Sequence, residues 1–576
     1  VIKSSEDDIP DLPSVSSFPN HGDDKVNGIR DLIDFFPVRI MIQPAAVLDS
    51  PNTRLRLRTE EGAVNIACTA IPDGDHAGDY LTDIDTARAL REAATHKVSD
   101  RGYTLDDGEF LERLKTAGQG ILIAEGREPM KNQSLILEIE QDMITILEST
   151  LNLSIDSVET MFRYRNLRPS LGASGGGPDR DDVTNFPDDP ENDSDVVFIH
   201  GYNVTAEKAR GWHSEIFKRL FWSGSKARFH GVTWYGDQGL VFKTLRYYAD
   251  VTNAFHTSEH FADYINEDLK GDVTVMAHSA GNIVASAAIH DHGASVDRYY
   301  MFNAPLSKEV FLGESQAENP GLIHAAWRQE NNKYNAVLYA SEWSRLFGDS
   351  DSRSKLTWRD RFKNVTTTDV INFYSETDNV LHDFDREGTS SPPVGYVQYA
   401  RSYPWCIAQL TKGRSQVGDF EILGVSVAMG WGFNGRIYPD GWAHDPMIIY
   451  TAGQMDDVIA QGTDILKPVP FFSPAGMEDL FEEGEAGSGF AEENHARIMA
   501  YGIPARDYAV GANYTFPGEE QNENMIKYVL KDANDKLIWP SNRLKGGLKW
   551  WHSDIRDVAY VYNYTLFDAI SGRGVN

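Results

Sequence analysis

The sequence predicts an α/β fold built on a mostly parallel sheet, with a separate β-rich domain before it. From residue 196 onward, short apolar runs alternate with segments long enough for crossover helices, which is typical of strands buried on both faces of a parallel sheet. Before residue 170, β-rich runs alternate with turn residues instead. Between these parts, residues 171–195 combine a triple glycine, prolines and many acidic side chains, which is typical of a linker.

These patterns predict six parts along the chain. They are a flexible leader (1–27), a β-rich accessory domain (28–170), an acidic Gly/Pro linker (171–195), an α/β core (196–380), an insertion or lid subdomain (381–545) and the end of the core (546–576). The leader is polar and rich in Pro and Ser, which favours flexibility. We expect the accessory domain to pack beside the core without supplying a catalytic group.

Apolar or β-rich runs predict the individual strands. In the accessory domain they lie at 38–44, 54–59, 63–71, 120–126 and 134–140, with a helical pattern at 85–96. In the core they lie at 196–199, 232–235, 273–277, 298–302 and 370–374. The core runs are mostly apolar, as expected of strands that have no solvent-facing side.

Length and charge exclude several classes of protein. At 576 residues the chain is too long for a single small binding module. Its 86 Asp and Glu against 54 Lys and Arg give a formal net charge of −32, which repels phosphate backbones and anionic lipids. Nucleic acid is therefore not an expected partner. No apolar run is long enough to predict a transmembrane segment. The oligomeric state stays open.

The chain has two cysteines, Cys68 and Cys406. This is too few for a disulfide scaffold, and neither has the Cys/His spacing of a zinc site. Whether they pair stays open, and no metal or organic cofactor is expected. The first residues, VIKSSEDD, lack an initiating methionine and a signal-peptide pattern, so we expect a mature or trimmed product.

The sharpest motif lies in the run VTVMAHSAGNIVASAAI (273–289). An apolar strand leads directly into Ala277-His278-Ser279-Ala280-Gly281 and then into a helix rich in small residues. A nucleophile elbow needs this strand–turn–helix context and small residues on both sides of its serine, which Ala277 and Gly281 provide. Alanine stands where the GxSxG pattern has its first glycine. A serine that merely caps the helix is the alternative.

A second motif, His200-Gly201-Tyr202-Asn203, follows the first strand of the core. A loop in this position can offer a backbone N–H to the oxyanion of acyl transfer, and the residue after the nucleophile can offer another. We assign these two donors to Tyr202 and Ala280. An ordinary turn with Asn203 as a helix cap is the alternative. The occurrence of both motifs in the right order argues against it.

A serine nucleophile also needs a general base and a carboxylate that orients the base. Asp378 and Glu376 lie in the turn after the last core strand, where ligands meet a parallel sheet, and we prefer Asp378. His552 lies on the loop that enters the final amphipathic segment, and we prefer it as the base. His444, in GWAHDP, is the main competitor.

The segments VVFIHGYN, VTWYG, MAHSAGN and NAPL resemble the α/β-hydrolase superfamily, in particular poorly characterised bacterial members with HGYN and AHSxGN signatures. The specific resemblance covers about 196–306, and the first 195 residues lie outside it. It implies an α/β-hydrolase fold and a serine hydrolase with Ser279 as nucleophile, Asp378 as acid and His552 as base. The insertion before His552 is larger than a simple loop.

The aromatic-rich insertion can form a lid or a pocket wall, or it can be a separately packed subdomain. We expect the substrate pocket to be lined by His200, Gly201, His278, Trp405 and Trp442.

The predicted function is the hydrolysis of carboxylic esters through an acyl-enzyme, as in esterases and lipases. The expected partner is a small-molecule or a polymeric or aromatic ester. Amide hydrolysis or acyl transfer would use the same residues. A non-catalytic structural or binding protein of the cell surface, built on a hydrolase scaffold, is the alternative from another class. We expect an extracellular or cell-surface location in a bacterium, with the cytoplasm as the alternative.

Overall fold

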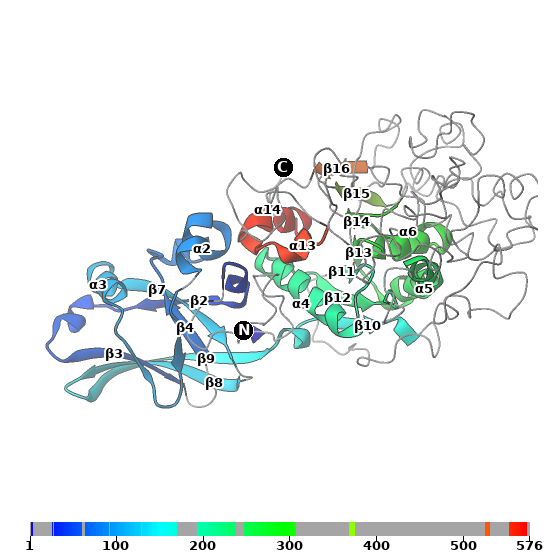
Figure 1. Cartoon of the computed structure of the whole chain (residues 1–576). Coiled ribbons are helices and arrows are strands. Elements are labelled where there is room, and N and C mark those ends of the chain that lie inside the picture. The colour runs from blue at the N-terminus through cyan, green and yellow to red at the C-terminus, as the bar shows by residue number, and fades with distance from the viewer. Residues whose placement is uncertain are drawn as a thin grey trace, which may run out of the picture.

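The structure is a computed structural model. It describes residues 2–3, 26, 28–59, 64–91, 93–127, 130–169, 193–237, 247–306, 368–374, 525–529 and 552–572. Within these ranges the strands form two sheets, which lie side by side in Figure 1. One is a parallel sheet with helices packed against it, and the other is a largely antiparallel sheet in the N-terminal region. The predicted fold class is therefore confirmed.

Seven strands of the described chain form the parallel sheet, in the order β10-β12-β11-β13-β14-β15-β16. Their bounds are β10 Arg163–Asn166, β11 Ser194–Ile199, β12 Arg228–Thr233, β13 Asp272–His278, β14 Arg298–Phe302, β15 Asp369–Tyr374 and β16 Met525–Val529. Every neighbouring pair among them is parallel. Because the strands are parallel, their carboxyl ends meet at one edge of the sheet, where loops can assemble a site.

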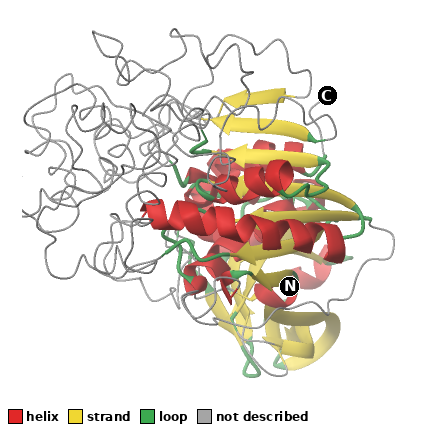
Figure 2. Ribbon diagram, turned by 90° about the vertical axis from the view of Figure 1, so that its right-hand side faces the viewer, coloured by secondary structure: helices red, strands yellow, loops and turns green. Residues whose placement is uncertain are grey.

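Helices lie on both sides of this sheet, with α4, α13 and α14 towards the N-terminal region and α5 and α6 away from it (Figures 1 and 2). Their bounds are α4 Ala206–Trp222, α5 Tyr247–Asp268, α6 Gly281–Asp291, α13 Asp554–Asp557 and α14 Tyr560–Ile570. Helix α4 begins after Thr205, whose side chain accepts a hydrogen bond from the backbone N–H of Lys208. None of the helices in the described part of the chain is long and apolar enough to cross a membrane.

The N-terminal sheet has nine described strands, in the order β5-β4-β7-β1-β9-β8-β3-β6, with β2 also paired to β7. The bounds are β1 Ile2–Lys3, β2 Phe36–Met41, β3 Thr53–Thr59, β4 Val64–Cys68, β5 His96–Val98, β6 Tyr103–Leu105, β7 Gln119–Gly126, β8 Met130–Gln141 and β9 Ile144–Ser157. Its helices are η1 Arg30–Asp34, η2 Ala45–Asp49, η3 Gly74–His76, α1 Asp79–Thr82, α2 Ile84–Leu90, α3 Gly108–Ala117 and η4 Val158–Thr160. All its pairs are antiparallel except those of β1.

Strand β10 contradicts the predicted domain boundary at residue 170. Its residues Arg163–Asn166 pair with β12 and so belong to the parallel sheet, although they precede the linker. The sequence RYRN lacks an apolar run because β10 is the edge strand of the sheet, so the strand pattern missed it. The predicted leader 1–27 also contributes a short strand, because Ile2–Lys3 pairs with β7 and β9.

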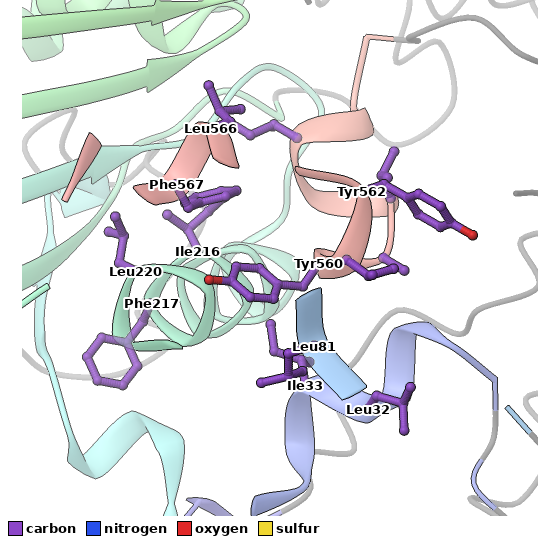
Figure 3. Packing of buried hydrophobic residues seen from close by; sticks show 14 of the residues in the cluster. Leu32, Ile33, Leu81, Ile216, Phe217, Leu220, Tyr560, Tyr562, Leu566 and Phe567 are labelled. Atoms are coloured by element: carbon purple, nitrogen blue, oxygen red, sulfur yellow. The ribbon is translucent and has the colours of Figure 1, made fainter. Parts of the chain in front are cut away.

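The N-terminal region and the parallel-sheet region share one hydrophobic core (Figure 3). Helix α14 contacts α1 and α2 as well as α4, so it is packed between the two regions. The side chains that meet there include Leu32, Ile33, Leu81, Ile216, Leu220, Tyr560 and Leu566. The two sheets are thus separate, but the apolar packing between them is continuous.

Candidate active site

Ser279 occupies the turn between β13 and α6, at the carboxyl edge of the parallel sheet. Its φ of 50° lies in the left-handed region that residues with a side chain rarely adopt. The turn is held by a backbone hydrogen bond from the N–H of Ser279 to the carbonyl of Phe302 on the neighbouring strand (3.0 Å). Backbone strain of this kind, held in place by the surrounding hydrogen bonds, is found mainly at functional sites.

Two glycines allow the chain to pass close to this turn. A Cβ at Gly281 would lie 2.5 Å from the carbonyl oxygen of His200 and 2.7 Å from that of Ile199. A Cβ at Gly201 would lie 2.7 Å from Cβ of Ser279. All three distances are shorter than real Cβ contacts, which is why only glycine fits at these two positions.

His552 lies beside the serine. Its Nε2 is 2.7 Å from Oγ of Ser279, and both residues are 8% exposed. The histidine precedes α13, so the chain brings it to the site from the far end of the described residues. In this arrangement the hydroxyl can donate to Nε2 and lose its proton to the same nitrogen, which is the geometry of an activated nucleophile.

The loop after β11 runs past Ser279. Within it, Asn203 has a φ of 57°, and its backbone N–H donates to the carbonyl of Gly236 (2.6 Å). Tyr202 precedes Asn203 on this loop, and Ala280 follows the serine at the start of α6. The two predicted oxyanion donors therefore stand on the two segments that flank the serine.

Comparison with known proteins agrees with this geometry. The family model described as the alpha/beta hydrolase family matches residues 196–485, just over half of the chain. The chain belongs to the alpha/beta hydrolase family. No curated protein matches it.

One solved structure that the chain resembles is an extracellular alpha/beta-hydrolase from a Paenibacillus species, described as sharing structural and functional homology with tobacco salicylic acid binding protein 2. The identity is 19%, the match covers 31% of this chain and 77% of that chain, and the TM-score is 0.17.

In this alpha/beta hydrolase, the predicted acid lies outside the described residues. Asp378 and Glu376 both follow β15. Phe302 of β14 pairs with His278 of β13 and with Phe373 of β15, so these three strands end at the same level. The carboxyl end of β15 therefore lies at the edge of the sheet that carries the elbow. His444, Trp405, Trp442 and Cys406 also lie outside the described residues.

His200, predicted to line the pocket, is held by hydrogen bonds on both of its ring nitrogens. It is fully buried, its Nδ1–H donates to the carbonyl of Gly201 (2.8 Å), and its Nε2 lies 3.0 Å from Oγ1 of Thr233. Burial, reinforced by nearby His213, holds the pKa of His200 well below its ordinary value. The imidazole is therefore neutral, and its bond to Gly201 orders the loop that follows β11.

His278 was also predicted to line the pocket, and in the structure it bonds the segment that bears His552. The residue is 3% exposed, and its Nε2–H donates to the backbone carbonyl of His552 (2.7 Å). Its ring stacks on Trp212, with 4.6 Å between the centroids. The residue before Ser279 therefore bonds the segment that bears His552.

Sequence reasoning missed Asn282, although it is the last residue of the quoted motif AHSAGN. Its Nδ2 donates to the carbonyls of Ala277 (3.0 Å), Ser279 (2.9 Å) and, more weakly, Phe302 (3.3 Å). Its Oδ1 accepts from the hydroxyl of Tyr299 (2.8 Å). The side-chain amide of Asn282 thus bonds both the end of β13 and the turn at Ser279.

Sequence reasoning also missed Arg168, which follows the edge strand β10. Its guanidinium lies 2.7 Å from Oδ1 of Asp237, and its Nη2 donates to the carbonyl of Val204 (3.3 Å) in the loop between β11 and α4. No pattern in the sequence marks this residue. Within the described ranges, His, Cys, Asp and Glu side chains do not gather into a group of three or more that could hold a metal ion.

Proposed function

We propose that this alpha/beta hydrolase is a serine hydrolase that cleaves carboxylic esters through an acyl-enzyme. The observation that carries the proposal is the 2.7 Å separation between Oγ of Ser279 and Nε2 of His552, at a turn with a φ of 50°. A serine hydroxyl is a weak nucleophile, and a base within hydrogen-bond distance is what makes it reactive.

In the proposed reaction, Oγ of Ser279 attacks the ester carbonyl carbon while Nε2 of His552 takes the hydroxyl proton. The backbone N–H groups of Tyr202 and Ala280 donate to the oxyanion that forms. The C–O bond then breaks, and His552 gives its proton to the leaving alcohol. Water attacks the acyl-enzyme by the same route and releases the acid. Asp378 is proposed to orient the imidazole and stabilise its charged form. The reaction requires no metal ion or organic cofactor.

The proposed substrates carry an acyl or aryl group large enough to use the insertion 381–545. Burial of such a group is worth about 25 cal/mol per Å² of apolar surface. Trp405 and Trp442 are the proposed contacts, supported by their aromatic character within a segment inserted before the base.

An extracellular or cell-surface location is also proposed. It is supported by the net charge of −32, which favours solubility in varied surroundings. Fractionation of the source cells with an antibody against this chain tests the location.

Labelling with a fluorophosphonate tests the proposed function, because only an activated serine reacts. We expect the wild-type protein to be labelled and to hydrolyse members of a p-nitrophenyl ester series from acetyl to palmitoyl. A folded Ser279→Ala variant should show neither reaction. A folded wild-type protein that is neither labelled nor active contradicts the proposal and favours a non-catalytic scaffold. Cleavage of anilides without cleavage of esters favours an amidase.

A further inference from the structure

The N-terminal region and α4 meet at a group of charged side chains that are almost completely buried. The group consists of Arg30 and Asp34 from η1 with Glu215, Lys218 and Arg219 from α4, and we name it the buried charge cluster. Each of the five residues is at most 4% exposed. Nζ of Lys218 lies 2.7 Å from Asp34 and 2.8 Å from Glu215. Oε2 of Glu215 lies 3.0 Å from Arg30 and 3.1 Å from Arg219.

Each region supplies ionic partners to the other in this cluster, since Arg30 and Asp34 of η1 pair with Glu215 and Lys218 of α4. Burial by itself raises the pKa of a carboxyl group, yet the three cations of the cluster hold the pKa of Glu215 well below its usual range. Asp34 supplies the second negative charge, directly to Lys218. A buried ion that loses its partner is strongly destabilised, so the position of α4 depends on η1.

Arg219 connects the buried charge cluster to the segment that bears His552. Its Nη2 donates to the carbonyl of Arg556 (2.6 Å), and its Nη1 donates to Oδ1 of Asn563 (2.9 Å). Nδ2 of Asn563 donates in turn to the carbonyl of Ile555 (3.3 Å). Arg556 and Ile555 belong to α13, which begins directly after the turn at His552. One guanidinium thus holds the short helix that follows the base.

Helix α4 reaches the same histidine by a second route. Trp212, also on α4, stacks on His278, whose Nε2–H donates to the backbone carbonyl of His552 (2.7 Å). The guanidinium of Arg556 lies over the ring of Trp212, 4.0 Å from its centroid. Helix α4 therefore supports the segment that bears the base at two points, at His552 through His278 and at Arg556 of α13.

We propose that Arg30 and Asp34 are positioning residues for His552, acting through α4. This inference rests on the proposed function of Ser279 and His552 as a catalytic pair. It gives η1 a role in positioning the base, although η1 contacts no reacting atom, and it replaces the expectation of a merely accessory domain. The reason is geometric, because a displacement of about 1 Å between reacting groups can cost about 100-fold in rate.

The test compares Asp34→Asn with a matched variant, Asp107→Ala, in the full-length protein. Asp107 caps α3 by accepting from the N–H of Phe110 (2.8 Å), and α3 packs in a separate apolar cluster of the N-terminal sheet. Its loss therefore weakens the same region without touching α4. Steady-state kinetics on a p-nitrophenyl ester, measured well below both unfolding midpoints, give kcat and KM.

We expect Asp34→Asn to lower kcat by at least about tenfold with KM within about twofold, because only the base is displaced. Asp107→Ala should leave both constants unchanged. The double variant Asp34→Asn/Lys218→Met also removes the buried ammonium that loses one of its two carboxylate partners in Asp34→Asn, so it should recover part of the lost kcat. If Asp34→Asn does not fold, the kinetics of this double variant provide the test in its place.

A readout that does not need turnover separates this proposal from the proposed function. The ring ¹⁵N–¹H signals of His552, assigned with His552→Gln, should move in Asp34→Asn and stay in place in Asp107→Ala. A folded Asp34→Asn variant with unchanged kcat and unchanged His552 signals overturns the proposal, and so does an equal loss of kcat in Asp107→Ala. If the wild-type protein is inactive while the His552 signals still move, the proposed function fails and the positioning role stands.

Discussion

Ser279 and His552 meet at 2.7 Å, but the chain holds them in two different ways. Ser279 is held by its own neighbourhood, because β13 precedes it, α6 follows it, and Asn282 bonds the carbonyls of Ala277 and Ser279. His552 is held from a distance. Its backbone is bonded by His278, and the helix after it is bonded by Arg219 of α4.

This difference separates local from long-range control of one site. The strain at the elbow costs on the order of 1–3 kcal/mol and is offset by the bonds of Asn282 within the motif and by the bond from the N–H of Ser279 to Phe302 on the adjacent strand. The position of the base depends on packing between elements far apart in the sequence. Changes at a distance are therefore expected to act on the base and to leave the nucleophile in place.

Removal of either member of the pair should have the largest effect. We expect Ser279→Ala and His552→Ala each to lower kcat/KM by about 1,000-fold or more, because the serine needs the histidine to take its proton and the histidine needs the serine as nucleophile. The double variant should be no worse than the single ones. Ester hydrolysis and circular dichroism of the three variants check this. Additive losses in the double variant would show that the two residues do not act as a unit.

A methyl group at Gly281 should disturb the turn that holds Ser279. Its Cβ would meet two backbone carbonyl oxygens at 2.5 and 2.7 Å, which cannot move aside as a flexible side chain can. Gly281→Ala should therefore lower the free energy of unfolding by about 1–3 kcal/mol and distort the elbow, lowering kcat.

Gly78→Ala is the matched control for this substitution, since nothing lies within 4 Å of its Cβ position. It should stay within about 0.5 kcal/mol of the wild type. Denaturant titration measures both variants. Parental stability and activity in Gly281→Ala would contradict the close approach.

His278 allows the long-range side to be tested at a single hydrogen bond. His278→Phe keeps an aromatic ring against Trp212 but removes the donor to the carbonyl of His552. We expect kcat to fall about tenfold, which corresponds to the roughly 1.4 kcal/mol of one hydrogen bond. His278→Gln retains a donor and should lose less. Equal activity of the two variants would mean that this bond does not position the base.

Substitution of Asp195 should have the smallest effect on activity, because Asp195 lies at the amino end of β11 and Ser279 lies at the carboxyl end of the same sheet. Asp195 is bonded by Arg228 (2.7 Å) and His230 (2.9 Å). Burial raises the pKa of Asp195, but these two partners outweigh burial and hold it below its usual range. A depressed pKa gives stability that is fully present above about pH 4 and is lost as the pH falls below that value.

Asp195→Asn should therefore unfold more easily than the wild type at pH 7, by a difference that shrinks towards pH 3. Its kcat at pH 7 should stay within about twofold of the wild type because it is remote from the elbow. Denaturant titrations between pH 7 and pH 3 measure the difference. A gap that is constant over this range would rule out an electrostatic origin.

Short-range patterns were enough to predict the parts of the site that depend on steric fit. Ala277 and Gly281 mark a tight turn because larger side chains cannot pass there, and the structure has such a turn at Ser279. The apolar core runs predicted the parallel sheet because its inner strands have no solvent-facing side. The position of His552 before the last helix also came from the sequence, whereas Asp378 lies outside the described residues.

Tertiary structure alone decided the rest. The edge strand β10 has no apolar run, so only its pairing with β12 reveals it. The direction of His278 follows from the stacking of Trp212 and the approach of the C-terminal segment, neither of which leaves a local pattern. Asp34 and Lys218 meet because two regions share a core. A buried ion pair needs proximity in space, and a sequence shows only proximity along the chain.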